Sequence, residues 1–408
     1  MWKQGSFLLL ALMLLLAGCS SEASLVRDAI VTSLDKPNYE IHGTMKLVGD
    51  LEKLPEVLGE STDPEFAALA DALKAGITIT GAQSDLRNAN LVLKVNDDKL
   101  LRESGMWSGE QIAQAEMVLH DDMVYIKTPL DQKFVAMDSR YQTSDAHSAN
   151  NLDPVKLNEL NDKMNTLAQD FIKKYIAKYG YKLNHAKNLG RETVKLPNGQ
   201  SVQATHVSIE LDLKELVSMF LFAAKDATTN AEVKKFAVEL MVLTQALEEE
   251  HEGKAKKSTE AEKRAMAEAS VTIGMNALKE WLDTEGKKYT ADEIVRMAKE
   301  EGLNELKWTL DYYIDDAKIP VHQTGTLLLT FQQPESKQPL TFGLETDFYM
   351  FNVGNATSIS VPKADQTVTM EMLAADRQTL SHFHEKSFLR KWIEWELEQQ
   401  KGRLPATP

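Results

Sequence analysis

The chain has 408 residues, of which 43% are hydrophobic, and it carries a formal net charge of −15. This acidic balance argues against nucleic-acid binding, which needs a basic surface, and against broad electrostatic docking on anionic lipid. The hydrophobic content is enough for a real core, and the length allows two domains or one large one. The chain contains a single cysteine, so an intrachain disulfide is excluded.

The first twenty residues resemble a bacterial lipoprotein signal peptide. Lys3 supplies the positive start, the run from Phe7 to Ala17 is uncharged and apolar, and Leu16-Ala17-Gly18-Cys19 matches the lipobox. The apolar run is too short to cross a bilayer of ~30 Å as a helix. The resemblance implies that residues 1–18 are removed as a signal peptide, that Cys19 carries a diacylglycerol, and that residues 19–24 form a lipidated tether.

This resemblance predicts a protein anchored to the cell membrane on its extracytoplasmic side through the diacylglycerol on Cys19. The lipobox needs a thiol at this position because the sulfur is the nucleophile that takes the lipid. An ordinary secretory signal with an incidental cysteine is the alternative. The lipobox interpretation is favoured because Cys19 is the only cysteine of the chain and stands where the motif requires it.

Between residues 24 and 140 the sequence predicts a short helix followed by closely spaced strands. Ser24 to Leu34 forms the helix, and apolar and polar residues alternate from Asn38 to Leu47, which is typical of a strand. Asp63-Pro64 predicts the start of another small helix. Further strands are expected at Ile77–Leu86, Leu91–Val95, Glu116–Leu119, Met123–Lys127 and Phe134–Met137. Such tight spacing predicts an antiparallel meander.

The middle of the chain is predicted to be mostly helical. Asp153-Pro154 indicates the start of a long helix that reaches about Tyr179, and Pro197-Asn198-Gly199 indicates a hairpin turn between two strands. Capping-box pairs start two of the helices expected between Lys214 and about Leu303. One of these helices has an apolar stripe at helical spacing, made of Met266, Ala269, Ile273, Ala277 and Trp281.

Strands are predicted again in the last quarter of the chain. Apolar and polar residues alternate from Leu306 to Asp315, and further strands are expected at Val321–Phe331, Leu340–Met350 and Thr357–Val361. A final helix is expected from Asp376 to about Lys401, with Trp392 and Trp395 on one side of it.

Two stretches resemble the lipoprotein carrier (LolA-like) superfamily, which includes the outer-membrane lipoprotein chaperones and the mycobacterial-type lipid-carrier lipoproteins. The first stretch comprises Gly190 to Val194 and, after a turn, Ala204 to Asp212; the second runs from Trp308 to Val321. The resemblance implies an α+β fold in which a curved antiparallel sheet forms a half-barrel and a helical layer covers its concave face. It also implies an apolar cavity between sheet and helices that holds acyl chains.

The same resemblance predicts the domain organisation. Residues 25–365 are expected to form the carrier-like domain, with an enlarged helical block at about 214–303. Residues 366–408 are expected to form a C-terminal helical extension. The enlarged block is longer than the family norm, and the extension is additional to the family fold.

The candidate ligand-binding residues are apolar side chains at even positions of two late strands: Trp308, Leu310, Tyr312, Phe348 and Met350. Because side chains alternate along a strand, each set faces one side of the sheet. The functional interpretation is that they line a cavity for an acyl chain or another amphiphile. The alternative is an ordinary core beneath helices.

No motif in the sequence indicates catalysis or metal binding. His382-Phe383-His384-Glu385 places two imidazoles at i and i+2, which do not share a helix face. Asp311, Asp315 and Asp316 lack the glycine and glutamate spacing of a calcium-binding loop. The sequence therefore predicts a non-enzymatic protein without cofactor or metal.

Two functions remain open from the sequence. The first is binding of a hydrophobic or lipidic ligand in the cell envelope, which predicts an apolar cavity of several hundred Å³ between sheet and helices. The second is a cell-envelope interaction or structural lipoprotein whose sheet is filled by its own helices. It predicts an exposed apolar or aromatic patch, for example at the helix with Trp392 and Trp395.

Overall fold

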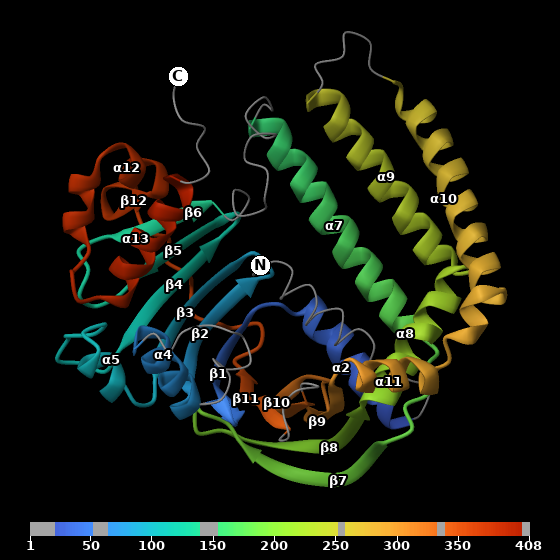
Figure 1. Cartoon of the computed structure of the whole chain (residues 1–408), viewed down its shortest axis with the longest axis horizontal. Helices are drawn as coiled ribbons and strands as arrows, with labels where there is room; N and C mark the ends of the chain where they lie inside the picture. The colour runs from blue at the N-terminus through green and yellow to red at the C-terminus, as the bar shows by residue number, and fades with distance from the viewer. Residues whose placement is uncertain (1–20, 52–63, 139–153, 252–257, 333–338, 402–408) are drawn as a thin grey trace. The chain divides into compact units, whose positions relative to one another are not determined.

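The structure, a computed structural model, describes residues 21–51, 64–138, 154–251, 258–332 and 339–401. It contains helices and a curved, unclosed twelve-stranded sheet (Figure 1), which confirms the predicted α+β class. The chain divides into two compact units. The helical unit comprises residues 1–34, 141–188 and 209–301, and the sheet unit comprises residues 35–140, 189–208 and 302–408.

The twelve strands follow the order β12-β6-β5-β4-β3-β2-β1-β11-β10-β9-β8-β7 across the sheet. They are β1 (Tyr39–Gly49), β2 (Ile77–Asp85), β3 (Asn88–Val95), β4 (Gln114–His120), β5 (Met123–Lys127), β6 (Phe134–Asp138), β7 (Ala186–Lys195), β8 (Ser201–Asp212), β9 (Leu303–Asp315), β10 (Pro320–Phe331), β11 (Leu340–Phe351) and β12 (Thr367–Thr369). The predicted strands up to residue 350 are all present, with ends displaced by a few residues.

Three features of the sheet unit differ from the sequence predictions. The sheet is mixed, because β12 pairs with β6 in parallel, whereas the pairings from β6 to β9 are antiparallel. The segment 357–361 is not a strand; Thr357 instead donates its backbone N–H and its hydroxyl to the Glu40 carboxylate. The final helix begins at Phe388, because the preceding residues form a separate short 3-10 turn.

One face of the strands β1, β9, β10 and β11 is apolar, and it is called the apolar face below. Gln323 of β10 pairs with Tyr312 on one side and Phe348 on the other, and Phe348 pairs with Gly43, so these four residues share the face. No charged residue occupies it at the even positions 304–314 and 340–350 or the odd positions 39–49 and 323–329. Such a face is suited to burial.

Gly43 is a close-approach site on the apolar face. A Cβ atom at this position would lie 2.2 Å from Cδ1 of Phe348 and 2.4 Å from the backbone oxygen of Asp347. The missing side chain therefore lets the Phe348 ring lie across the neighbouring strand. Any larger residue at position 43 would displace the ring or part the two strands.

The C-terminal segment packs against the edge of the sheet formed by β6 and β12. It contains η3 (Ala364–Gln366), α12 (Met370–Ala375), η4 (Arg377–His382) and α13 (Phe388–Lys401). Leu373, Phe383 and Ile393 are fully buried in one apolar cluster with Val135 of β6 and Val368 of β12. Two further helices of the sheet unit, α4 (Pro64–Ala75) and α5 (Lys99–Glu103), contact each other, and α4 also contacts β1 and β3.

The helical unit is built from α2 (Ser21–Asp35), α7 (Pro154–Lys178), α8 (Leu213–Ala227), α9 (Ala231–His251), α10 (Glu260–Asp283), η2 (Glu285–Lys288) and α11 (Ala291–Glu300). Helix α9 contacts both α7 and α10, and α8 contacts α11. Aromatic rings contribute to this packing: Phe171 stacks on Phe236 at 4.3 Å, and the buried Tyr179 hydroxyl donates to the Met219 carbonyl at 2.9 Å. In the part of the chain that the structure describes, no helix combines the length and apolarity needed to span a bilayer.

Candidate functional site

A partly open cavity of about 520 Å³ lies at the end of the sheet where the β7–β8 and β9–β10 turns meet the end of β11. Its apolar wall consists of Leu196, Val202, Ala317, Ile319, Val321, Met350, Phe351 and Val353. The remaining lining residues are Lys36, Gln200, Asp315, Asn352 and Gly354. Apolar walls with a few polar side chains are typical of small-molecule sites.

The β9–β10 turn is fixed by its own hydrogen bonds. The Asp315 carboxylate accepts the backbone N–H of Ile319 at 2.8 Å, and the Lys318 N–H donates to the Asp315 carbonyl at 3.0 Å. Lys318 has a φ of 60°, a left-handed conformation that a tight turn can impose on a non-glycine residue. These bonds place the buried Ile319 against the cavity.

The other side of the cavity is fixed by asparagines that link separate segments. The Asn198 amide donates to Asn352 Oδ1 at 3.1 Å, and the Asn352 amide donates to Glu40 Oε2 at 2.9 Å. The β7–β8 turn, the end of β11 and the start of β1 are thereby joined. Gly199, with a φ of 86°, closes the β7–β8 turn that the Asn-Gly pair predicts. The rim is therefore largely preformed.

The lining of the cavity contains two charged residues. Its charged lining residues are Lys36, which is exposed at the rim, and Asp315, whose carboxylate is used by the turn. In the described ranges, no group of three or more His, Cys, Asp or Glu side chains is placed to hold a metal ion. The arrangement can hold an apolar group inside and leave a polar group at the mouth.

The structure brings the predicted ligand-binding residues together on one face but places only one of them in the cavity. Trp308, Leu310 and Tyr312 are buried, and Phe348 and Met350 are half-buried. Met350 lines the cavity. The cavity residues missed by the sequence prediction lie in or next to turns, where no alternation marks them.

Tyr312 is unusual among the residues of the apolar face. Its side chain is 2% exposed, and its hydroxyl has no hydrogen-bond partner among the described residues. Burial raises the pKa of this hydroxyl well above its ordinary value. A buried hydroxyl without a hydrogen-bond partner lowers the stability of the fold, so the Tyr312 hydroxyl is a destabilising group on this face.

The opposite face of the same strands carries a row of stacked rings. His206 of β8, Tyr313 of β9, His322 of β10 and Tyr349 of β11 stack in sequence, with ring centroids 4.3, 4.7 and 4.1 Å apart. These four residues are called the ring ladder below. The ladder spans four neighbouring strands and ties the β7–β8 edge to the middle of the sheet.

Carboxylates hold both histidines of the ring ladder. His206 Nδ1 lies 3.0 Å from Glu192 and Nε2 lies 3.0 Å from Asp311, while His322 Nε2 lies 2.9 Å from Asp347. Burial alone lowers the pKa of His206, but the hydrogen bonds to its two carboxylates outweigh burial and raise it. Because carboxylates only accept hydrogen bonds, the two contacts of His206 are best met by the imidazolium.

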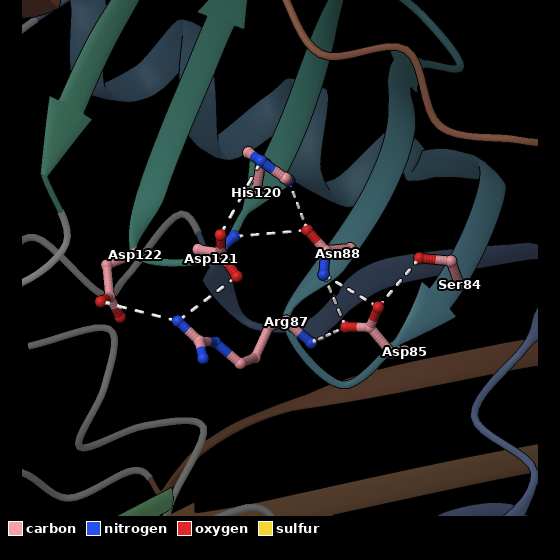
Figure 2. A network of polar contacts seen from close by, with 7 residues as sticks. All are labelled: Ser84, Asp85, Arg87, Asn88, His120, Asp121 and Asp122. Carbon is pink, nitrogen blue, oxygen red and sulfur yellow. Dashed lines mark hydrogen bonds and ion pairs between the residues drawn. The ribbon is translucent and has the colours of Figure 1, made fainter. Parts of the chain in front are cut away.

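A second polar network joins two hairpin turns, as Figure 2 shows. The Asp85 carboxylate accepts from the backbone N–H of Arg87 and from the Asn88 amide, each at 2.8 Å. Burial raises the pKa of Asp85, but these hydrogen bonds outweigh it and lower the pKa. Asn88 Oδ1 lies 2.6 Å from His120 Nδ1, which connects the β2–β3 turn to the β4–β5 turn. This network therefore has a structural role, because its hydrogen bonds hold the β2–β3 and β4–β5 turns together.

Two other sequence predictions bear on sites. Cys19, the predicted lipidation site, lies outside the described residues. The motif His382-Phe383-His384-Glu385 supplies main-chain contacts: the His382 carbonyl accepts from Gln132, and the His384 N–H donates to Asp131. The motif thus fixes the C-terminal segment to the loop before β6.

Neither a protein-family model, nor a curated protein, nor a solved structure matches this chain.

Proposed function

We propose that this chain is a membrane-anchored extracytoplasmic lipoprotein that binds a hydrophobic or lipidic ligand, and that the ligand occupies the cavity at the turn end of the sheet. The observation that carries the proposal is the cavity of about 520 Å³ with its mainly apolar wall. This volume lies within the range of roughly 300–1,000 Å³ that is typical of small-molecule sites. The function is non-enzymatic.

The composition of the wall favours an aliphatic group over a polar ligand. Each methylene moved from water into the cavity contributes about 0.8 kcal/mol. Lys36 and the amide of Gln200 lie at the same mouth and suit a polar or anionic headgroup that stays near water. An amphiphile with one acyl chain meets both requirements.

Native mass spectrometry tests ligand binding. The chain with Cys19→Ser would be purified under mild conditions, stripped of lipid, and offered phospholipid and free fatty acid in separate samples. We expect a discrete mass increase that corresponds to one bound molecule. A protein that keeps its bare mass, under conditions in which a known lipid carrier stays loaded, would contradict the proposal.

Two tryptophan substitutions locate the bound molecule. Val353→Trp fills the cavity from a half-buried position and should weaken retention by about tenfold, equivalent to about 1.4 kcal/mol. The matched control is Val92→Trp in a separate cavity of about 260 Å³, which is lined mainly by polar residues. Equal losses in both variants, with unchanged thermal unfolding, would place the ligand elsewhere.

The anchor is tested separately. Cys19→Ala should move the protein from the membrane fraction to the soluble fraction or leave it unprocessed, because the thiol that takes the lipid is gone. Unchanged membrane fractionation of the variant would contradict the lipobox interpretation.

An interaction function is the second candidate, and exposed aromatic residues favour it. Trp395 on α13 is 56% exposed, although Trp392 packs against the C-terminal apolar cluster. The predicted patch on this helix therefore consists of one tryptophan. A larger exposed apolar surface lies on α10.

A further inference from the structure

One side of the cavity belongs to the hairpin of β7 and β8, which forms an edge of the sheet (Figure 1). The part of it that lies in the sheet unit, Leu189–Ser208, is called the edge hairpin below. Leu196, Gln200 and Val202 of this segment line the cavity. The shape of the cavity therefore depends on how firmly the edge hairpin is held against the rest of the sheet unit.

The ring ladder packs against residues that form the cavity wall. Tyr313 and Tyr349 of the ladder contact an apolar cluster. That cluster contains Leu196, Ile319 and Val321, and these three residues also line the cavity. A movement of the edge hairpin away from the ladder would therefore change the wall of the cavity.

Side-chain contacts from Arg191, Asn198 and His206 tie the edge hairpin to other parts of the sheet unit. Neither the guanidinium of Arg191 nor the amide of Asn198 titrates between pH 5 and 8, whereas an imidazole does. His206 makes its contact through Nε2, which lies 3.0 Å from the Asp311 carboxylate of β9. Its ring also stacks on Tyr313 of the same strand. The His206 contact is therefore the one that responds to pH in this range.

His206 can satisfy both of its carboxylate partners only when it is protonated. Its Nδ1 lies 3.0 Å from Glu192 of β7, and its Nε2 lies 3.0 Å from Asp311. A neutral imidazole has one N–H, so one of these contacts would then set a ring lone pair against a carboxylate oxygen. Loss of the proton would also leave two like charges on either side of the ring. Deprotonation therefore weakens the contact between the edge hairpin and β9.

Carboxylates dominate the charged groups that face His206. Glu192 faces it from β7, and Asp311 faces it from β9 together with the ring of Tyr313. Titratable groups further along this face are His322 on β10 and Asp347 and Tyr349 on β11. In the described part of the chain, the ion-pair partner of both Glu192 and Asp311 is His206. Burial lowers the pKa of His206, but its hydrogen bonds to these two carboxylates outweigh burial and raise it.

We propose that His206 is a pH-sensitive switch: its imidazolium holds the edge hairpin against β9 at acidic pH, and deprotonation loosens the hairpin and releases the molecule bound in the cavity. The release step rests on the proposed function, whereas the loosening of the hairpin does not. The imidazolium contributes fully below the unfolded pKa of about 6.5, and its contribution is lost as pH rises through the raised folded pKa. The cavity therefore retains a ligand more tightly at pH 5.5 than at pH 8.5.

Ligand binding at two pH values tests the release step. The probe is lysophosphatidylcholine with one saturated acyl chain, because its headgroup does not titrate between pH 5.5 and 8.5. Calorimetric titration of the full chain with Cys19→Ser, below the critical micelle concentration of the probe, should give about tenfold tighter binding at pH 5.5, a usual size for coupling between two sites. Equal affinities at the two pH values would overturn the proposal.

Two substitutions should remove the pH dependence in opposite directions. In Glu192→Gln, a neutral His206 can donate to Asp311 and accept from the new amide, so binding should stay tight at pH 8.5. In His206→Gln, the amide nitrogen can reach one carboxylate only, so binding should be about tenfold weaker at pH 5.5 as well. His120→Gln, in the network of Figure 2, is the matched control and should keep the full pH dependence. Either test variant with an unchanged pH profile would overturn the proposal.

Hydrogen exchange of the ligand-free chain tests the hairpin by itself. Protection factors, which correct for the pH dependence of intrinsic exchange, should fall about tenfold in the edge hairpin between pH 5.5 and 8.5. They should stay constant in Glu192→Gln and in strand β3, which is far from the hairpin in the strand order. Constant protection of the edge hairpin would overturn the proposal even where the probe binds. A pH-dependent hairpin in a chain that binds no probe would support the switch and contradict the proposed function alone.

Discussion

Tyr312 and Tyr313 are neighbours in β9 and have the same side chain, but they occupy opposite environments. Tyr312 lies on the apolar face with its hydroxyl buried and unpaired among the described residues. Tyr313 lies on the other face, stacked between His206 and His322. The comparison shows that the position in the strand alternation, rather than residue type, decides what a side chain contributes.

The two faces are stabilised in different ways. The apolar face depends on burial, which is insensitive to pH. The ring ladder contains His206, whose pKa is raised by its hydrogen bonds to Glu192 and Asp311, so the stability of this face changes with the protonation of His206. Substitutions on the two faces should therefore differ in size and in pH dependence.

The largest effect is expected from truncating the apolar face. Leu310→Ala removes a side chain that is 2% exposed and should lower the free energy of unfolding by about 2–5 kcal/mol. Thr309→Ala, one residue away on the other face, should cost less than about 1 kcal/mol. Urea unfolding of both variants measures the difference, and equal losses would mean that the two faces are buried alike.

A smaller, pH-dependent effect is expected from the ring ladder. The folded pKa of His206 is raised, so its imidazolium stabilises the fold below the unfolded pKa of about 6.5, and this contribution is lost as pH rises through the folded pKa. His206→Gln should cost about 1–2 kcal/mol at pH 5.5 and less at pH 8.5. Unfolding midpoints at the two pH values provide the measurement, and a pH-independent loss would exclude an imidazolium at this position.

The smallest effect, of opposite sign, is expected from the unpaired hydroxyl. Tyr312→Phe removes a buried group that has no partner among the described residues, and it should be neutral or stabilise the protein by up to about 1 kcal/mol. Tyr179→Phe is the matched control, because its buried hydroxyl donates to Met219 and its loss should cost about 0.5–1.5 kcal/mol. Thermal unfolding separates the two; a destabilised Tyr312→Phe would reveal a partner for the hydroxyl.

Much of the fold could be predicted from the sequence because its signals are local. Alternation identified the strands that contain Tyr312 and Phe348, and Asn198-Gly199 identified a hairpin turn. The three-residue β12 was missed because it is too short to show alternation, and it is held by buried neighbours in the C-terminal segment.

The candidate site could be predicted only in part. Its lining combines Lys36, Leu196, Ile319 and Val353, which come from four distant segments brought together by strand pairing. No spacing in the sequence connects them. Periodicity likewise predicted the apolar stripe at Met266, Ile273 and Trp281 on α10. A helical period alone does not show whether such a stripe is buried in a core or exposed, and in the structure these three side chains are exposed.

The parallel strand β12 has a consequence for the solubility of the chain. Strand β12 forms backbone hydrogen bonds with the outer edge of β6, and the C-terminal helices bury the side chains of Val135 and Met137 of β6. A chain ending before Thr367 would leave β6 as a bare, apolar edge with unpaired N–H and C=O groups, which is a template for pairing between molecules. The C-terminal segment therefore prevents intermolecular strand pairing at β6, and expression vectors for this protein should retain it.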